Sequence, residues 1–336
     1  ALVFTPIAIG WQHDQQAKLD MPEPLPGSLV IFIGSVLIAA VLVIIGRLIR
    51  AGSNGIAAFV GRWIRIPAIW MRLAIAVVLL VLAGVAVNVG MTWLIGSYDT
   101  VNADASGQEP TNLGLNSGST DSLTPWDTLG REGRFYVSNT MTPADITGIT
   151  GRPSDTPVRV YVGMQQGDTP QARTQLALEE LDRVDAWSRK YLVIFGVTGT
   201  GWVDPNSINA LEAVTDGDVT TVAVQYSAVP SWIGFIVDPQ TTVDQNRDTI
   251  DAVVAAWREK PADQRPELIL FGQSLGSLGT QGAWTADATP EDVVSEIPHV
   301  IWMGPPAESV LWKSWQANRT GGPAWEPIVG DGSITR

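Results

Sequence analysis

The sequence predicts an α/β protein, a mostly parallel sheet with helices on both faces, preceded by two transmembrane helices. Residues 24–98 contain no Asp or Glu, although the chain of 336 residues carries 34 acidic and 21 basic side chains. Beyond about residue 151, short apolar runs rich in β-branched residues alternate with amphipathic stretches. Such alternation is typical of parallel strands buried between two layers of helices.

Two apolar, uncharged runs, 29–46 and 73–95, interrupt the acid-free region. Each is close to the roughly 20 residues that a helix needs to cross a hydrocarbon core of about 30 Å. A pair of buried core helices is the alternative. Arginines without compensating acids lie between the runs, at Arg47, Arg50, Arg62, Arg65 and Arg72. This bias favours a cytoplasmic loop within a membrane region 28–95, with segment 1–27 and everything after residue 95 outside the cytoplasm. We therefore expect a multi-pass cell-membrane protein.

The composition excludes several classes of site and partner. The chain has no cysteine, so it forms no disulfide, thiolate metal site or cysteine nucleophile. A net charge of -13 and a pI near 4.5 argue against nucleic acid as a partner. No cofactor or metal site is predicted. The first residues lack an initiator Met and a basic segment, so they do not resemble a signal peptide and could be the tail of a preceding span.

The outer part begins with residues 96–150, which are rich in Gly, Ser, Thr, Asn and Asp and predict a linker or loose cover. Residues 126–137 form an apolar and aromatic island within it, which predicts a strap that packs on the following domain. Residues 151–336 predict strands at 158–162, 192–197, 219–224, 268–271 and 300–303, and helices at 170–189, 205–214, 243–257 and from 275. In such a sheet, ligands bind at the carboxyl ends of the strands.

The motif Gly272-Gln273-Ser274-Leu275-Gly276 directly follows the apolar run 268–271. A strand, a sharp turn through a serine and then a helix is how an α/β-hydrolase presents its nucleophile. An ordinary turn serine is the alternative. As a nucleophile, Ser274 needs N–H donors for the oxyanion that forms, and the backbone N–H of Leu275 at the head of the next helix is one candidate.

The second donor is expected from the loop Thr198-Gly199-Thr200 at the carboxyl end of strand 192–197. A phosphate-binding turn is the alternative for this Gly-bearing loop. A lone Gly-x-Gly is weak evidence for a nucleotide, and no acidic ribose partner follows the next strand, so the oxyanion loop is preferred.

The general base is not evident. The chain contains two histidines, His13 and His299, and an α/β-hydrolase presents Ser, acid and His in that order. His13 precedes both apolar runs, and His299 lies at the start of a strand, about 15 Å from the nucleophile end of the sheet. Asp238 and Asp287 are available acids, but neither is well placed. The chain is therefore either an inactive enzyme or incomplete, and the absence of a further strand after 300–303 favours incompleteness.

Four segments, 126–134, 197–205, 225–232 and 271–277, resemble an actinobacterial family of membrane-anchored α/β-hydrolases. The resemblance implies an N-terminal membrane region, an extracytoplasmic α/β-hydrolase domain at 151–336 and a nucleophile at Ser274. It further implies that the acid and a Gly-flanked His follow the region where this chain stops, so the chain is expected to be truncated at both ends.

The expected function is therefore a membrane-tethered serine hydrolase, esterase-like or lipase-like, or an acyltransferase, that works through an acyl-Ser274 intermediate. Its predicted partners are an acyl ester, such as an envelope lipid, and the lipid bilayer. Trp202 and Trp232 either line an acyl pocket or pack in the core. The alternatives are a catalytically inactive scaffold or binding protein with the hydrolase fold, and a transporter subunit, which the absence of ionisable residues in both apolar runs disfavours.

Overall fold

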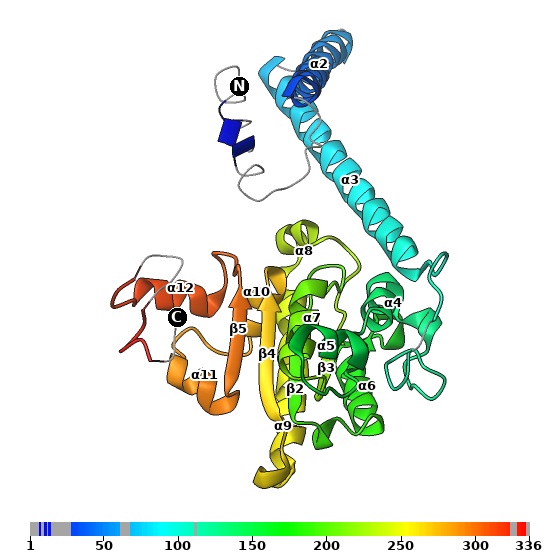
Figure 1. The fold of residues 1–336 in the computed structure, drawn as a ribbon. Helices are drawn as coiled ribbons and strands as arrows, with labels where there is room; N and C mark the ends of the chain where they lie inside the picture. The colour runs from blue at the N-terminus through cyan, green and yellow to red at the C-terminus, as the bar shows by residue number, and fades with distance from the viewer. Residues whose placement is uncertain are drawn as a thin grey trace. The chain divides into compact units, whose positions relative to one another are not determined.

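The structure is a computed structural model that describes residues 7, 10–11, 13–14, 28–60, 68–110, 113–322 and 328–333. Its contacts divide the chain into two compact units, Ala1–Met91 and Thr92–Arg336. The first unit contains α2 (Ser28–Val60) and most of α3 (Ala68–Ala103). The last three turns of α3 belong to the second unit, which contains the sheet (Figure 1).

The sequence predicts two membrane spans, but only one helix among the described residues is long and apolar enough to be one. Leu73–Ala103 is long and apolar enough to cross a membrane, whereas the apolar stretch of α2 is the shorter Phe32–Ile44. Helix α2 also continues to Val60, so Arg47 and Arg50 lie on a helix and not in the predicted loop. Arg62 and Arg65 lie outside the described residues, as does most of segment 1–27. Length and composition thus indicate one candidate span, Leu73–Ala103, and no second helix of that length and composition is found in the described part of the chain.

The second unit is built on five parallel strands in the order β1-β3-β2-β4-β5. All five lie where the sequence predicts strands, with small changes at their ends. They are β1 (Val158–Val162), β2 (Tyr191–Gly196), β3 (Val219–Val224), β4 (Glu267–Gln273) and β5 (His299–Met303). The first four are almost wholly buried, as continuous apolar strands of a covered parallel sheet should be.

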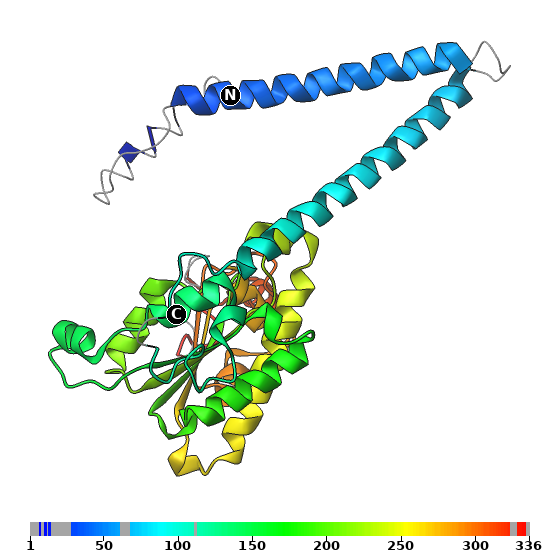
Figure 2. The same ribbon diagram turned by 90° about the vertical axis from the view of Figure 1, so that its right-hand side faces the viewer.

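Helices cover both faces of the sheet (Figure 2). One apolar cluster joins β1 to β4 with α6 (Pro170–Arg183) and α9 (Pro239–Glu259). On the other face, a second cluster joins the sheet with α4 (Gly130–Ser138) and α7 (Pro205–Val214). Helix α10 (Leu275–Gln281) follows β4 and packs between β4 and α9. The predicted layered α/β arrangement is confirmed.

Several helix boundaries differ from the prediction. Helix α6 ends at Arg183 because Asp185 has a φ of 52° and starts a short 3-10 turn, η3 (Ala186–Ser188). Helix α9 begins four residues before the predicted start, where the Asp238 carboxylate accepts the Thr241 N–H at 3.2 Å. The sequence reading missed α8 (Ser231–Val237), α11 (Pro290–Glu296) and α12 (Val310–Ala317), together with the short turns η1 (Trp126–Thr128), η2 (Met164–Gln166) and η4 (Ala262–Gln264).

The structure places the predicted linker, residues 96–150, inside the second unit. The segment forms α4 and α5 (Pro143–Thr150), and Leu129, Tyr136 and Ile146 are buried. The Tyr136 hydroxyl and Thr221 Oγ1 share a hydrogen bond of 2.6 Å, and the ring centroids of Tyr136 and Tyr161 lie 5.6 Å apart. Residues 126–137 are therefore packed on the domain, and the described part of segment 96–150 lies inside the second unit as a cover.

Candidate active site

Ser274 lies on a sharp turn between β4 and α10 at the carboxyl edge of the sheet. Its backbone has φ 52° and ψ -119°, a conformation that non-glycine residues rarely adopt. Its N–H donates to the carbonyl of Met303, the last residue of β5, at 2.9 Å. The side chain is exposed to solvent, and among the described residues no hydrogen-bond partner is found for Oγ. This strained, exposed serine has the geometry of a nucleophile elbow.

Glycines around Ser274 allow helix α10 to approach the sheet this closely. A Cβ on Gly276 would lie 2.0 Å from the carbonyl oxygen of Gly196 in β2, and one on Gly272 would lie 2.6 Å from Thr280 Oγ1. Thr280 Oγ1 donates to the Gly276 carbonyl at 2.9 Å and accepts the Trp302 indole N–H at 3.0 Å. The two glycines of the motif are thus required by packing, which the motif alone could not show.

Leu275 starts α10, and no acceptor is found among the described residues for its backbone N–H. Its side chain is buried, which anchors the start of the helix on the domain. The first N–H groups of a helix have no partner within the helix, so they remain available for an anion beside Ser274. The position agrees with the predicted role of Leu275 as an oxyanion donor.

The loop after β2 approaches the same turn, since a Cβ on Gly276 would lie 3.1 Å from the Val197 carbonyl. The Thr198 N–H donates to the Trp202 carbonyl at 3.1 Å, and the Gly199 N–H donates to Ser231 Oγ at 3.0 Å. Among the three predicted loop residues, Thr200 is the one whose N–H has no acceptor in the described part of the chain. Thr200 is thus the loop residue whose N–H is not engaged, and its role as an oxyanion donor stays a prediction.

Buried polar side chains hold this loop from below. Gln225, which is fully buried, donates from Nε2 to the Thr200 carbonyl at 2.8 Å and to Asn102 Oδ1 at 3.0 Å. The Tyr161 hydroxyl donates to the Gly201 carbonyl at 2.9 Å. Burial raises the pKa of Tyr161 well above its ordinary value, so it stays a neutral donor at every relevant pH. The sequence reading missed Asn102, Tyr161 and Gln225, because their roles depend on contacts between distant segments.

His299 does not reach Ser274. It pairs in the sheet with Ile269, five residues before Ser274, so about 16 Å of strand separates them. Its Nε2 lies 3.4 Å from Glu267 Oε2, at the amino end of β5. His13 belongs to the other unit. No histidine among the described residues of the second unit lies at the carboxyl edge of the sheet.

The two candidate acids are engaged elsewhere. Asp238 caps α9 through the Thr241 N–H and hydroxyl. Asp287 accepts a hydrogen bond from Thr285, and this contact lowers the pKa of Asp287. Among the described residues of the second unit, Asp238, Asp287 and His299 therefore do not form an acid and base pair at Ser274. No group of three or more metal-ligating side chains was found among the described residues.

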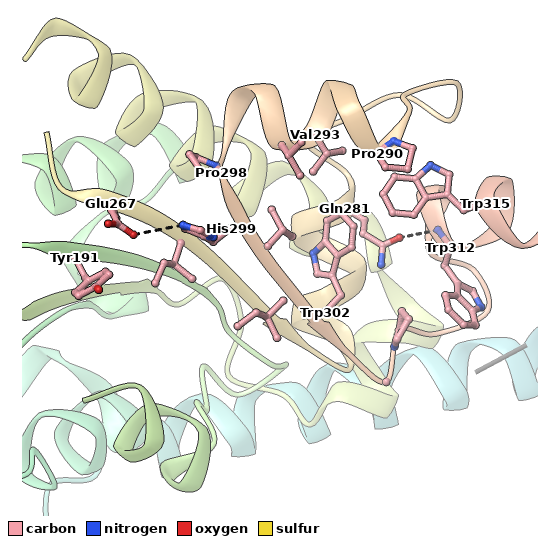
Figure 3. Close-up of a pocket in the computed structure, with 16 residues that line it drawn as sticks. Tyr191, Glu267, Gln281, Pro290, Val293, Pro298, His299, Trp302, Trp312 and Trp315 are labelled. Atoms are coloured by element: carbon pink, nitrogen blue, oxygen red, sulfur yellow. Dashed lines mark hydrogen bonds and ion pairs between the residues drawn. The ribbon is translucent and has the colours of Figure 1, made fainter. Parts of the chain in front are cut away.

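A cavity of about 920 Å³ lies along β5 and not at Ser274. Figure 3 shows His299 and Glu267 at one end and Trp302, Trp312 and Trp315 toward the other. The backbone N–H of Trp312 donates to Gln281 Oε1 at 2.9 Å, and the ring centroids of Trp302 and Trp315 lie 5.8 Å apart. The predicted pocket residues Trp202 and Trp232 do not line this cavity, and Trp232 is exposed on α8 instead of packing in the core.

Comparison with known proteins agrees with this geometry. A family model described as "Alpha/beta-hydrolase family" matches residues 158–336, and one described as "Alpha/beta-hydrolase family N-terminus" matches residues 1–140. The chain belongs to this alpha/beta-hydrolase family. No curated protein and no solved structure matches the chain. In this chain, Ser274 lies on a strand-turn-helix elbow after β4, the kind of turn that predicts a nucleophile in this fold.

Proposed function

We propose that this family member is a membrane-tethered serine hydrolase that acts on acyl esters through an acyl-Ser274 intermediate. The observation that carries the proposal is the backbone of Ser274, which is strained at φ 52° while its hydroxyl is exposed and has no partner among the described residues. Strain of this kind costs about 1–3 kcal/mol and persists where function needs it. The proposed location is the cell membrane, with the second unit outside the cytoplasm. The apolar Leu73–Ala103 helix supports the membrane location, and the arginines without compensating acids before it support the side.

In the proposed reaction, Ser274 Oγ attacks the ester carbonyl and forms a tetrahedral oxyanion. The N–H groups of Leu275 and Thr200 donate to that oxyanion, and its collapse expels the alcohol and leaves an acyl-serine, which water then hydrolyses. The attack requires a base that accepts the Ser274 proton and returns it to the departing alcohol, and the same group then takes a proton from the water that releases the carboxylic acid and returns it to Ser274. The proposal assigns no described residue to this role, because His299 lies at the far end of β5.

Labelling of the full chain by a fluorophosphonate probe tests the proposal. The wild-type protein should be labelled, and Ser274→Ala should not, because the probe reacts only with an activated serine. Ser277→Ala is a matched control, since Ser277 is a buried serine three residues further along α10. Equal labelling of wild type and Ser274→Ala would refute Ser274 as the nucleophile.

One observation favours a second candidate, a hydrolase-fold protein that binds an envelope component without catalysis. His299, the histidine of the second unit, lies at the end of β5 away from Ser274. In that case the wild-type protein, folded and membrane-bound, would show no probe labelling at all.

A further inference from the structure

Helix α8 presents an apolar face to solvent. Trp232 is 61% exposed and Ile236 is 73% exposed, and Phe235 and Val237 are exposed beside them. The helix carries no charged side chain, and Ile233 anchors it on the domain with 1% exposure. A cluster of large apolar side chains on one face of a folded unit marks a contact surface, because water alone would not favour it.

This face adjoins the candidate active site. Ser231, the first residue of α8, accepts the Gly199 N–H of the oxyanion loop at 3.0 Å. A Cβ on Gly234 would lie 3.7 Å from Leu275 Cδ2, in the residue after the nucleophile. Helix α8 also follows the carboxyl end of β3, and Figure 1 shows it at the end of the sheet where α10 begins.

The end of α3, residues 92–103, belongs to the second unit and lies at this same edge. Asn102, in its last turn, accepts from Gln225 at 3.0 Å, and Gln225 directly follows β3. The apolar run of α3 ends at Ile95, seven residues earlier, which is about 10 Å along a helix. A bilayer that contains this run therefore has its surface within about 10 Å of Asn102 along the chain.

We propose that the exposed face of α8 rests in the bilayer interface, with Trp232 and Ile236 among the lipid acyl chains. The substrate would then be a lipid ester that reaches Ser274 from the bilayer, so the choice of substrate rests on the proposed function, whereas the contact itself does not. Because α8 is uncharged and the chain has a net charge of -13, burial of apolar surface drives this contact, and added salt should not release it.

The absence of cysteine allows a direct test in the full chain. A single cysteine at Ile236→Cys is labelled with a fluorophore, and the protein is reconstituted into vesicles of phosphatidylcholine with brominated acyl chains. The matched control is Val214→Cys, which is 69% exposed and lies before β3, at the amino end of the strands. Brominated chains quench only groups that enter the hydrocarbon region, so quenching at 236 should exceed that at 214 by on the order of twofold or more.

Equal quenching at the two positions would overturn the proposal and would show that protein or water covers α8. The same pair is measured in the Ser274→Ala background. Strong quenching at 236 without any fluorophosphonate labelling of the wild type would preserve the membrane contact and refute the proposed hydrolase. Fluorophosphonate labelling of the wild type without stronger quenching at 236 would support the proposed hydrolase and refute the membrane contact of α8.

Discussion

Ser274 shows at the scale of one residue how the proposed function opposes stability. A φ of 52° with a ψ of -119° suits glycine, yet a serine occupies the position. We expect Ser274→Gly to raise the free energy of unfolding by about 1 kcal/mol relative to Ser274→Ala, because relief of roughly 1–3 kcal/mol of strain exceeds the 0.5–1 kcal/mol that glycine loses to chain entropy. Urea unfolding of both variants measures the difference.

Alanine is the appropriate reference here because it removes the hydroxyl and keeps the Cβ that causes the strain. Both variants should lose fluorophosphonate labelling. A glycine variant that is no more stable than the alanine variant would show that the elbow stores no strain.

A buried ion pair joins three elements of the second unit. Arg159 Nε in β1 lies 2.6 Å from Glu212 Oε1 in α7, and both side chains are at most 1% exposed. Arg159 Nη1 also donates to the backbone carbonyl of Tyr136 in α4 at 2.7 Å. We expect Glu212→Gln to cost about 3–5 kcal/mol of unfolding free energy, because it leaves a buried guanidinium without its counter-charge. Chemical denaturation with circular dichroism measures this cost.

The surface pair Arg152–Asp216 provides the control for that prediction. It has a similar separation of 2.7 Å, but its side chains are 55% and 36% exposed. Asp216→Asn should change the unfolding free energy far less than Glu212→Gln does, because water screens an exposed pair, and asparagine tolerates the φ of 52° at this position. Similar costs for the two substitutions would contradict the assignment of the Arg159–Glu212 pair to the core.

Glu180 in α6 ties the cover segment to the domain in a pH-dependent way. Burial alone would raise the pKa of Glu180, but hydrogen bonds from Arg183, Ser122 and the Leu123 N–H outweigh it and hold the pKa below its ordinary value. A carboxylate with a lowered folded pKa stabilises the fold fully above its unfolded pKa of about 4.3, and that contribution is lost as the pH falls through the folded value.

The stability difference between wild type and Glu180→Gln should therefore be largest near neutral pH and should shrink below about pH 4. Urea midpoints at several pH values measure it. Glu179→Gln, on the exposed side of the same helix, should show little difference at any pH. A gap for Glu180→Gln that does not change with pH would mean that the charge of Glu180 has no role.

At the scale of the molecule, the sheet and the nucleophile turn were predictable from sequence because both are local patterns. The run Leu268–Phe271 before Gly272 defines a strand, and the small residues around Ser274 define the turn. The contacts that complete the site join segments far apart in the chain. Gln225 binds Asn102 across 123 residues and Arg159 binds Glu212 across 53, and no periodicity in the sequence indicates which distant partner a buried polar residue will find.

Segment 96–150 illustrates the same limit. Its Gly, Ser and Asn content predicts a linker, yet these residues form tight contacts instead of flexible chain. A Cβ on Gly133 would lie 2.5 Å from the Tyr161 ring, so this glycine is needed for α4 to pack on β1. Arg134 is fully buried, and its guanidinium donates to the carbonyls of Asn102 and Asp104 at the end of α3.

The folding unit should therefore extend beyond the part that matches the hydrolase family model. That match begins at residue 158, but the compact unit begins at Thr92. A fragment that begins at residue 151 lacks Leu129, Tyr136 and Arg134, which exposes Tyr161 and removes a carbonyl partner of Arg159. We expect it to lack a cooperative urea transition by tryptophan fluorescence, whereas a fragment that begins at Thr92 should unfold in one transition.

Adding the peptide 92–150 in trans to the shorter fragment should restore part of that transition. Cooperative unfolding of the shorter fragment alone, with the same midpoint, would show that the segment is a dispensable cover.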